Sequence, residues 1–294
     1  MRKIDSEVTP THQDFELLVQ LRNSFIQKVG GEETLRSIFP ILIRETIDLV
    51  IDPVRTGRTR FEQLDNVEKT FIGLKVEHAL RDLLDVPKGL RDLVLDGVDV
   101  DVKNTVRDTW TIPPETYRNS EPCFLVASDE MNNQCWLGII VAREEYLTKT
   151  PNRDGKKSVS AAGFKNILWI LNGVIYPKSR WLDIDIERFR ELRRIRGGTK
   201  RAILFFRENL GRPIHRSVIE MLLFDQKDYM KRIRENGGAR DQLRKENIAV
   251  LSGLYDPLTI KELGYQNISA DEHIAIHAEA ADQQEFLRHL NLID

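Results

Sequence analysis

Hydrophobic residues recur at helical spacing over most of the first 84 positions of the chain. In residues 13–29 they stand three or four positions apart and stop at Gly30-Gly31, which predicts a first helix. The same spacing predicts further helices over 33–52 and 67–84, each followed within a few residues by a proline. The opening part of the chain is therefore expected to be helical.

The pattern changes to an alternation of apolar and polar residues after position 90. Segments 91–95 and 98–104 alternate in this way on either side of Asp96-Gly97, a pair that favours a two-residue hairpin turn. The apolar runs that predict two further strands are 122–128 and 135–142. Helices followed by strands favour an α/β or α+β fold for this part of the chain.

A polar stretch that contains glycine and proline, 150–158, separates this pattern from a second one. We therefore expect two domains, 1–157 with an N-terminal helical extension at 1–30, and 158–294. The second domain is predicted to be mostly helical. Its predicted elements are helices or mixed elements at 160–175 and 184–196, helices at 199–209, 214–224 and 225–235, and a short strand at 247–251.

Charge is distributed unevenly between these two parts. Residues 190–249 hold 16 Lys/Arg against 8 Asp/Glu, a balance of +8, and the rest of the chain holds 28 against 38, a balance of −10. A basic part joined to an acidic part favours contact with a polyanion. A solvated helical surface is the alternative interpretation of the same charges.

Several classes of protein are excluded by composition. No apolar run approaches the roughly 18 residues that cross a bilayer, and no apolar segment follows the basic N-terminus, so we expect no membrane partner and a cytoplasmic protein. Cys123 and Cys135, the two cysteines, are expected to be free thiols. The chain has no Gly-x-x-x-x-Gly-Lys loop, so no nucleotide cofactor is expected.

Candidate chemistry gathers on the predicted hairpin. Side chains alternate between faces along a strand, so Asp99, Asp101 and Lys103 should share one face. Asp92 begins the first hairpin strand, and folding about the turn should bring it close to Asp101. Two carboxylates and one ammonium would then converge. The alternative is a solvated strand face with a weak ion pair.

A third carboxylate, Glu77, lies on the helix predicted at 67–84. The apolar stripe expected to bury that helix is formed by Phe71, Leu74, Leu80 and Leu84. Glu77 falls on this stripe, and a buried carboxylate needs a partner. A divalent cation shared with Asp92 and Asp101 would supply one. A local salt bridge to Lys75 or Arg81 is the alternative.

Such a set suits the hydrolysis of a phosphodiester. Mg²⁺ prefers hard oxygen ligands and keeps several waters, so Glu77, Asp92 and Asp101 could hold it while positions remain for a phosphate oxygen and water. The ion would lower the pKa of the attacking water and neutralise developing charge. Lys103 would orient that water and add positive charge beside the phosphate.

Longer stretches resemble the NaeI-type restriction endonucleases. The loop and helix over 55–80 resemble the family's Arg-Thr-Gly-Arg loop and the helix that follows it, and 97–103 is similar to its Gly-Val-x-Val-Asp-x-Lys strand. TIPPE (111–115), ASDE (127–130) and NRDGKK (152–157) follow in the family's order. The segment 216–251 is similar to the one containing Asp-x-Met-Lys-Arg-x-Arg and Gly-Gly-Ala-Arg. The similarity covers roughly residues 50–265, and the first 30 residues have no counterpart.

This resemblance implies a restriction-endonuclease-like first domain whose catalytic positions match Glu77, Asp92, Asp101 and Lys103. It implies a second domain of helix-turn-helix type, a homodimer, and cleavage of both strands of duplex DNA at a short palindrome. Dimerisation is also expected because the two strands of DNA offer phosphates related by a twofold axis. A requirement for a second, effector DNA site is carried over more weakly.

Basic side chains in two regions are candidates for binding DNA. They are Arg55 and Arg58 in the RTGR loop, Arg212, His215 and Arg216 before and at the start of one helix, and Lys231, Arg232, Arg234, Arg240, Arg244 and Lys245 further on. Two other functions remain open. One is a nicking or repair nuclease, and the other is a non-catalytic DNA-binding regulator built on a nuclease scaffold.

Overall fold

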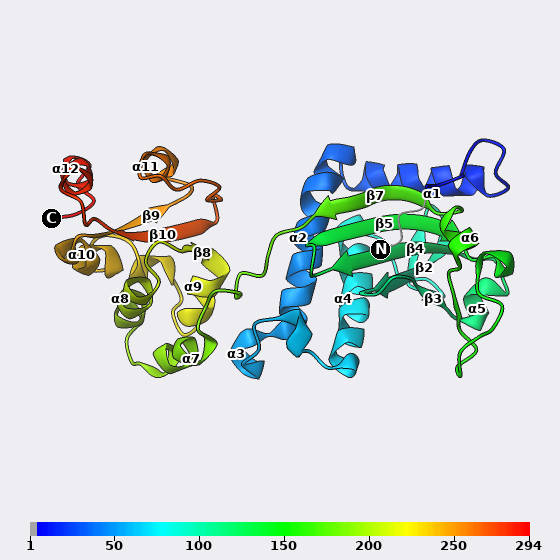
Figure 1. Cartoon of the computed structure of the whole chain (residues 1–294), viewed down its shortest axis with the longest axis horizontal. Helices are drawn as coiled ribbons and strands as arrows, with labels where there is room; N and C mark the ends of the chain where they lie inside the picture. Colours follow the sequence, from blue (N-terminus) through cyan, green and yellow to red (C-terminus); the bar gives the residue numbers. More distant parts are fainter. Residues whose placement is uncertain (1–4) are drawn as a thin grey trace. The chain divides into compact units, whose positions relative to one another are not determined.

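The computed structural model describes residues 5–294. The first part of the chain is built around a five-stranded sheet of order β1-β2-β4-β5-β7. β2 and β4 are parallel, and the other neighbouring pairs are antiparallel, so the sheet is mixed. The strands are β1 (Leu93–Leu95), β2 (Val98–Thr105), β4 (Pro122–Asp129), β5 (Gln134–Val141) and β7 (Leu168–Ile175). The predicted hairpin and the two following strands are confirmed, within an α/β architecture (Figure 1).

Three helices pack on one face of this sheet, and all three were predicted. They are α1 (Phe15–Lys28), α2 (Glu32–Ile51) and α4 (Asn66–Leu84). Their apolar side chains form one core with alternate residues of the strands, such as Phe124 and Leu137. Phe25 of α1 meets the ring of Phe124 at 5.1 Å, which makes the N-terminal extension part of this core. The first four residues of that extension lie outside the described residues.

The opposite face of the sheet is covered by short elements and loops. They are β3 (Thr111–Ile112), α5 (Pro114–Tyr117), η2 (Glu144–Tyr146), β6 (Lys157–Ser158) and α6 (Ala161–Phe164). Trp110, Tyr117 and Phe164 pack there against Cys123 and Leu125 of β4. Because β4 is buried on both faces, the edge formed by β2 and β1 is where polar side chains can gather.

The buried face of α4 differs from the predicted stripe. Ile72, Val76, Leu80 and Leu84 are the residues that α4 buries. Phe71 and Leu74 were expected in the core but are exposed. The reason is that α4 carries apolar residues on two sides, and only tertiary packing decides which of them faces the sheet.

The chain separates into two compact units at a different place from the predicted boundary. One unit is Met1–Ile51 with Arg60–Ser179, and the other is Asp52–Thr59 with Arg180–Asp294. The sequence placed the boundary at 157/158, but β7 follows that point and pairs with β5 as the fifth strand of the sheet. The polar stretch 150–158 is a surface loop of the first unit.

The second unit combines short helices with a three-stranded sheet of order β8-β10-β9. Its elements are α3 (Pro53–Thr56), α7 (Ile186–Arg194), α8 (Gly198–Glu208), β8 (Pro213–His215), α9 (Arg216–Leu222), η3 (Met230–Arg232), α10 (Ala239–Leu243), η4 (Arg244–Glu246), β9 (Ile248–Ser252), α11 (Pro257–Glu262), β10 (Glu272–His277) and α12 (Ala281–His289). The helix at 199–209 and the strand at 247–251 are confirmed to within a residue. The expectation of a mostly helical domain missed the sheet, because β8 has only three residues and pairs with β10, which lies far from it in the sequence.

The helix predicted at 225–235 is absent from the described structure. Only the short turn η3 forms there, since Asp228 accepts a hydrogen bond from the Lys231 backbone N–H at 3.0 Å. Ile233 is the one residue of this stretch that is fully buried, and Tyr229 and Met230 pack beside it against the core of the second unit.

A short segment between α2 and α4 belongs to the second unit. Arg190 of α7 donates from Nε to the Val54 carbonyl at 3.0 Å and from Nη2 to the Arg55 carbonyl at 2.8 Å. Gly57 has a left-handed backbone (φ +77°), and a Cβ there would lie 2.8 Å from Arg190 Nη1. The RTGR loop is therefore held against α7. No helix within residues 5–294 is long and apolar enough to span a membrane.

Candidate active site

The β1–β2 hairpin brings two aspartates together. Its turn residues, Asp96 and Gly97, both have positive φ angles (49° and 78°), as a two-residue hairpin turn requires. The pairing of Leu93 with Val100 fixes the register, and the Asp92 N–H donates to the Val100 carbonyl at 3.3 Å. Asp92 therefore lies beside Asp101, as the sequence predicted.

Asp92 is half-buried and its carboxylate is hydrogen-bonded. Oδ2 accepts a bond from the Val102 backbone N–H at 2.7 Å. Burial raises the pKa of Asp92 to about 7, and the hydrogen bond that it shares with Asp101 acts in the same direction. The Val102 N–H and the nearby Lys103 ammonium oppose this increase. Within the pair, Asp92 is the carboxyl that holds a proton near neutral pH.

Asp101 is the charged member of the pair and is only 3% exposed. Lys103 Nζ donates to its Oδ1, and the Thr116 hydroxyl donates to its Oδ2 at 2.7 Å. Burial raises the pKa of Asp101, but the hydrogen bonds with Asp92, Lys103 and Thr116 outweigh it and leave the pKa below its usual range. A buried, fully engaged carboxylate excludes the alternative of a solvated strand face.

Glu77 approaches the pair from α4 but is turned to Arg81. Arg81 Nη1 lies 3.5 Å from Glu77 Oε1 and donates to the Asp92 carbonyl at 2.9 Å. One guanidinium thus joins Glu77 to the backbone of Asp92. The local salt bridge that the sequence left open is present, with Arg81 and not Lys75 as the partner.

The oxygen ligands available for a cation are therefore two carboxylates side by side. Within residues 5–294, no three His, Cys, Asp or Glu side chains form a set that could hold a metal ion. Asp92 and Asp101 still fit Mg²⁺, because this ion often binds through one or two carboxylates and keeps most of its waters. Ligation by Glu77 stays a prediction, since it requires Glu77 to leave Arg81.

Two residues that the sequence did not single out support the pair. Thr116, fully buried on α5, orients the Asp101 carboxylate. Arg91 donates from Nε to Glu121 Oε2 at 2.6 Å, and its backbone N–H donates to Asp99 at 3.0 Å. Thr116 directly follows the TIPPE stretch, which was the only signal for it. No local pattern reveals Arg91, because its partner Glu121 is 30 residues away.

Most of the predicted DNA-binding side chains in the second unit are already engaged. Arg216 contacts Asp271, Arg240 contacts Asp256, and Arg244 contacts Asp294. Arg212 donates to the Asp183 carbonyl and Arg232 to Gln226. His215 caps α9 through Nδ1, and burial lowers its pKa to about 4, so it carries no positive charge at neutral pH.

The remaining basic candidates are exposed, apart from Arg58, which is half-buried. Within residues 5–294, Lys231, Arg234 and Lys245 make no ion pair and no side-chain hydrogen bond. In the RTGR loop, the Arg55 side chain is exposed and lies 3.3 Å from Asp52. Arg58 belongs to the same loop, which is part of the second unit. The catalytic candidates and these cations thus belong to different units.

The hairpin cluster places carboxylate oxygens, which suit a hard cation, beside an ammonium, which suits a phosphate. Asp101 provides a fixed negative oxygen, and Lys103 provides a positive charge next to it. Asp92 can exchange its proton for a cation near neutral pH. Carboxylates beside an ammonium are the arrangement that metal-assisted phosphodiester hydrolysis uses.

Comparison with known proteins gives a consistent result. A family model described as restriction endonuclease NaeI matches residues 35–285. The type II restriction enzyme NaeI of Lentzea aerocolonigenes is 32% identical to this chain over 255 residues, which cover 82% of this chain and 78% of the relative. The family-model match spans both units, from α2 to α12.

Proposed function

Since the chain belongs to the NaeI family of type II restriction endonucleases, we propose that it hydrolyses both strands of duplex DNA with Mg²⁺ held at Asp92 and Asp101. The observation that carries this proposal is the hydrogen-bonded pair of Asp92 and Asp101 beside Lys103. A pair of adjacent carboxyl groups with shifted pKa values is typical of a functional site.

The roles of the side chains follow from their positions. Mg²⁺, when bound, supplies Lewis-acid stabilisation of the phosphate and a more acidic water. Asp101, fixed by Thr116, would be the main ligand of the ion, and Asp92 in its charged form would be the second. Lys103 holds its ammonium beside Asp101 and is suited to orient the attacking water and to stabilise negative charge on the phosphate. Glu77 would be a third ligand if its carboxylate turned from Arg81 to the ion.

We assign DNA binding to the second unit. We propose that this unit is of helix-turn-helix type, as the family relationship implies, and the short connection between α7 and α8 suits such a motif. Lys231, Arg234 and Lys245 are exposed cations that could neutralise phosphates. Arg55 and Arg58 are candidates for the same role from the RTGR loop. His215 is a helix cap in our proposal and not a phosphate contact.

The finer features of the reaction are proposals of the same kind. We propose a homodimer that cuts a short palindrome, because a twofold axis places one cluster at each strand. The NaeI relationship also favours stimulation by a second, effector DNA site. We also propose that the protein acts in the cytoplasm, where it would meet its DNA substrate, and Mg²⁺ is the only cofactor proposed.

The test is cleavage of supercoiled plasmid by the purified chain. We expect linear product with Mg²⁺ and no product with EDTA. Lys103→Ala should reduce cutting by at least about 100-fold, because it removes the positive charge next to the phosphate. The same variant should bind DNA in Ca²⁺ as the wild type does. Lys28→Ala, which changes an exposed lysine of α1, is the matched control and should cut normally.

The other functions give different outcomes in this assay. Nicked circles without linear product would indicate a nicking or repair nuclease. DNA binding without cutting under any divalent metal would indicate a regulator. Either result would overturn the proposal of double-strand hydrolysis.

A further inference from the structure

The outer face of α4 carries large apolar side chains that no other part of the first unit covers. Val67, Phe71 and Leu74 are 66%, 50% and 53% exposed. They lie on the side of α4 opposite to the buried Val76 and Leu80. A soluble chain rarely exposes several large apolar residues together on one helix unless a partner covers them.

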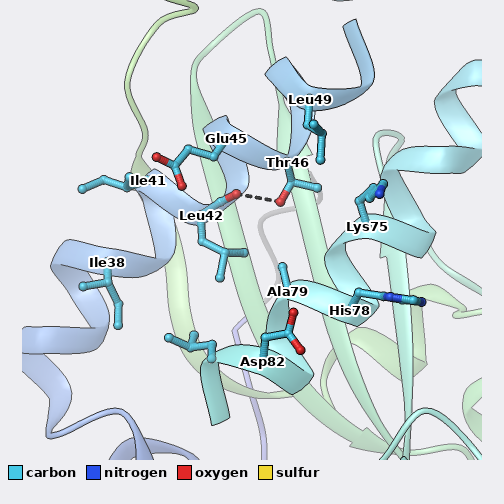
Figure 2. A pocket seen from close by; sticks show the side chains of 11 residues that line it. Ile38, Ile41, Leu42, Glu45, Thr46, Leu49, Lys75, His78, Ala79 and Asp82 are labelled. Carbon is cyan, nitrogen blue, oxygen red and sulfur yellow. Dashed lines mark hydrogen bonds between the residues drawn. The ribbon is translucent and has the colours of Figure 1, made fainter. Parts of the chain in front are cut away.

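The same face continues into a groove between α2 and α4. Figure 2 shows Ile41 and Leu49 projecting from α2 on one side, and Lys75 and His78 from α4 on the other. Ile41 and Leu49 are 43% and 59% exposed. The groove encloses about 650 Å³, so it can accept apolar side chains. Both helices belong to the first unit, and they pack directly against each other.

Charges on α4 are arranged so that this face complements itself. Lys75 and Asp82 are exposed, and within residues 5–294 neither makes an ion pair or a side-chain hydrogen bond. They lie seven residues apart, which is two helical turns, so they share one face of α4. They are also equally far from a point between His78 and Ala79. A twofold axis through that point would place each Lys75 opposite an Asp82.

We propose that this α2–α4 face binds a second copy of the chain, with the two α4 helices antiparallel across the axis. An interface of this kind is isologous, because the same patch occurs on both sides. Lys75 of one copy pairs with Asp82 of the other, twice. Phe71 and Leu74 are covered by the apolar residues around the partner's groove. The charge arrangement favours a copy of this chain over an unrelated partner, since the patch supplies both members of each ion pair.

The inference rests on the proposed function in one respect. The proposed double-strand cutting uses two catalytic clusters about a twofold axis, and α4 also carries Glu77, which Arg81 joins to one cluster. The proposed axis therefore gives the two clusters a fixed separation. It adds to the proposed homodimer the surface and the ion pairs that hold it.

The test uses charge reversal and mixing, with the molar mass measured by light scattering in buffer without DNA or Mg²⁺. The wild type should be a dimer. Lys75→Asp and Asp82→Lys each place like charges opposite each other and should weaken self-association by at least about tenfold. An equimolar mixture of the two variants should form a heterodimer, because the two reversed side chains then face each other as an ion pair and the two unchanged ones form the native pair. Lys88→Asp, an exposed charge after α4, is the control and should remain a dimer.

The mixture separates this proposal from trivial explanations. Variants that misfold, or that lose contact with a different partner, would stay monomeric when mixed, and this would overturn the proposal. Single variants that associate as tightly as the wild type would overturn it as well. Plasmid cutting is scored separately. If the variants associate as predicted but the wild type does not cut, only the proposed function is contradicted. If the wild type cuts but charge reversal leaves the dimer unchanged, only the proposed surface is contradicted.

Discussion

At the scale of single residues, the charge balance of the site depends on Asp92. It lies beside a second carboxylate, and only the Val102 N–H and Lys103 favour its charged form. Because its pKa is raised to about 7, folding favours the protonated form. Asp92 therefore contributes to the free energy of unfolding below about pH 4, and this contribution is lost as the pH rises through 7.

Replacing Asp92 with Asn should consequently stabilise the metal-free protein at high pH. Each unit of pKa shift corresponds to about 1.4 kcal/mol, and solvent reduces this energy at a half-buried site. We therefore expect Asp92→Asn to raise the free energy of unfolding at pH 8 by about 2 kcal/mol. The amide keeps an oxygen for the Val102 N–H. The difference should vanish towards pH 4. Urea unfolding at both pH values measures it, and an equal difference at both would contradict the raised pKa.

Thr116 allows a second prediction at this scale. Thr116→Val keeps the shape of the side chain but leaves Asp101 Oδ2 without its donor, which should destabilise the fold by about 2 kcal/mol and slow cutting about tenfold. Thr116→Ser restores the hydroxyl and should recover most of both. Calorimetric Ca²⁺ binding is a readout other than cutting, and it should weaken in the Val variant alone. Equal behaviour of the two variants would show that the hydroxyl does not position Asp101.

At the scale of elements, local chemistry determined what could be predicted. Asp96-Gly97 specifies its turn by backbone conformation, so the hairpin and the meeting of Asp92 with Asp101 followed from the sequence. The orientation of α4 could not be predicted from the sequence, because the helix has two apolar sides and only packing on the sheet distinguishes them. Thr116 was missed for a similar reason, since its contact with Asp101 depends on how α5 packs. The sheet of the second unit was missed because β8 has only three residues.

The segment that contains the RTGR loop supplies a prediction about an element. Arg190→Ala removes two hydrogen bonds to the Val54 and Arg55 carbonyls, so the loop should open more often. Trypsin should then cleave after Arg55 or Arg58 about tenfold faster. Arg188→Ala, on the same helix, breaks contacts with Glu191 and Glu208 and is the control. Similar cleavage of the loop in both variants would show that Arg190 does not hold it.

At the scale of the whole molecule, the proposed catalytic and DNA-binding residues are divided between two units. The acidic cluster belongs to the first unit and the exposed cations to the second. The chain passes between the units at Ile51–Asp52, Thr59–Arg60 and Ser179–Arg180. The basic balance of residues 190–249 predicted this division. The exact boundary could not be read from composition, because β7 pairs with a strand about 30 residues before it.

In the proposed reaction Asp101 is the essential carboxylate, and the acidity of β2 in general is not sufficient. The most direct test compares Asp101→Asn with Asp99→Asn on the same strand, by the rate of Mg²⁺-dependent plasmid cleavage. Asp99 only accepts the Arg91 N–H at 3.0 Å, a role that an amide oxygen can fill. We predict that Asp101→Asn slows cutting at least about 100-fold and that Asp99→Asn stays within about tenfold of the wild type. Wild-type cutting by Asp101→Asn, or an equal loss in both variants, would contradict the account.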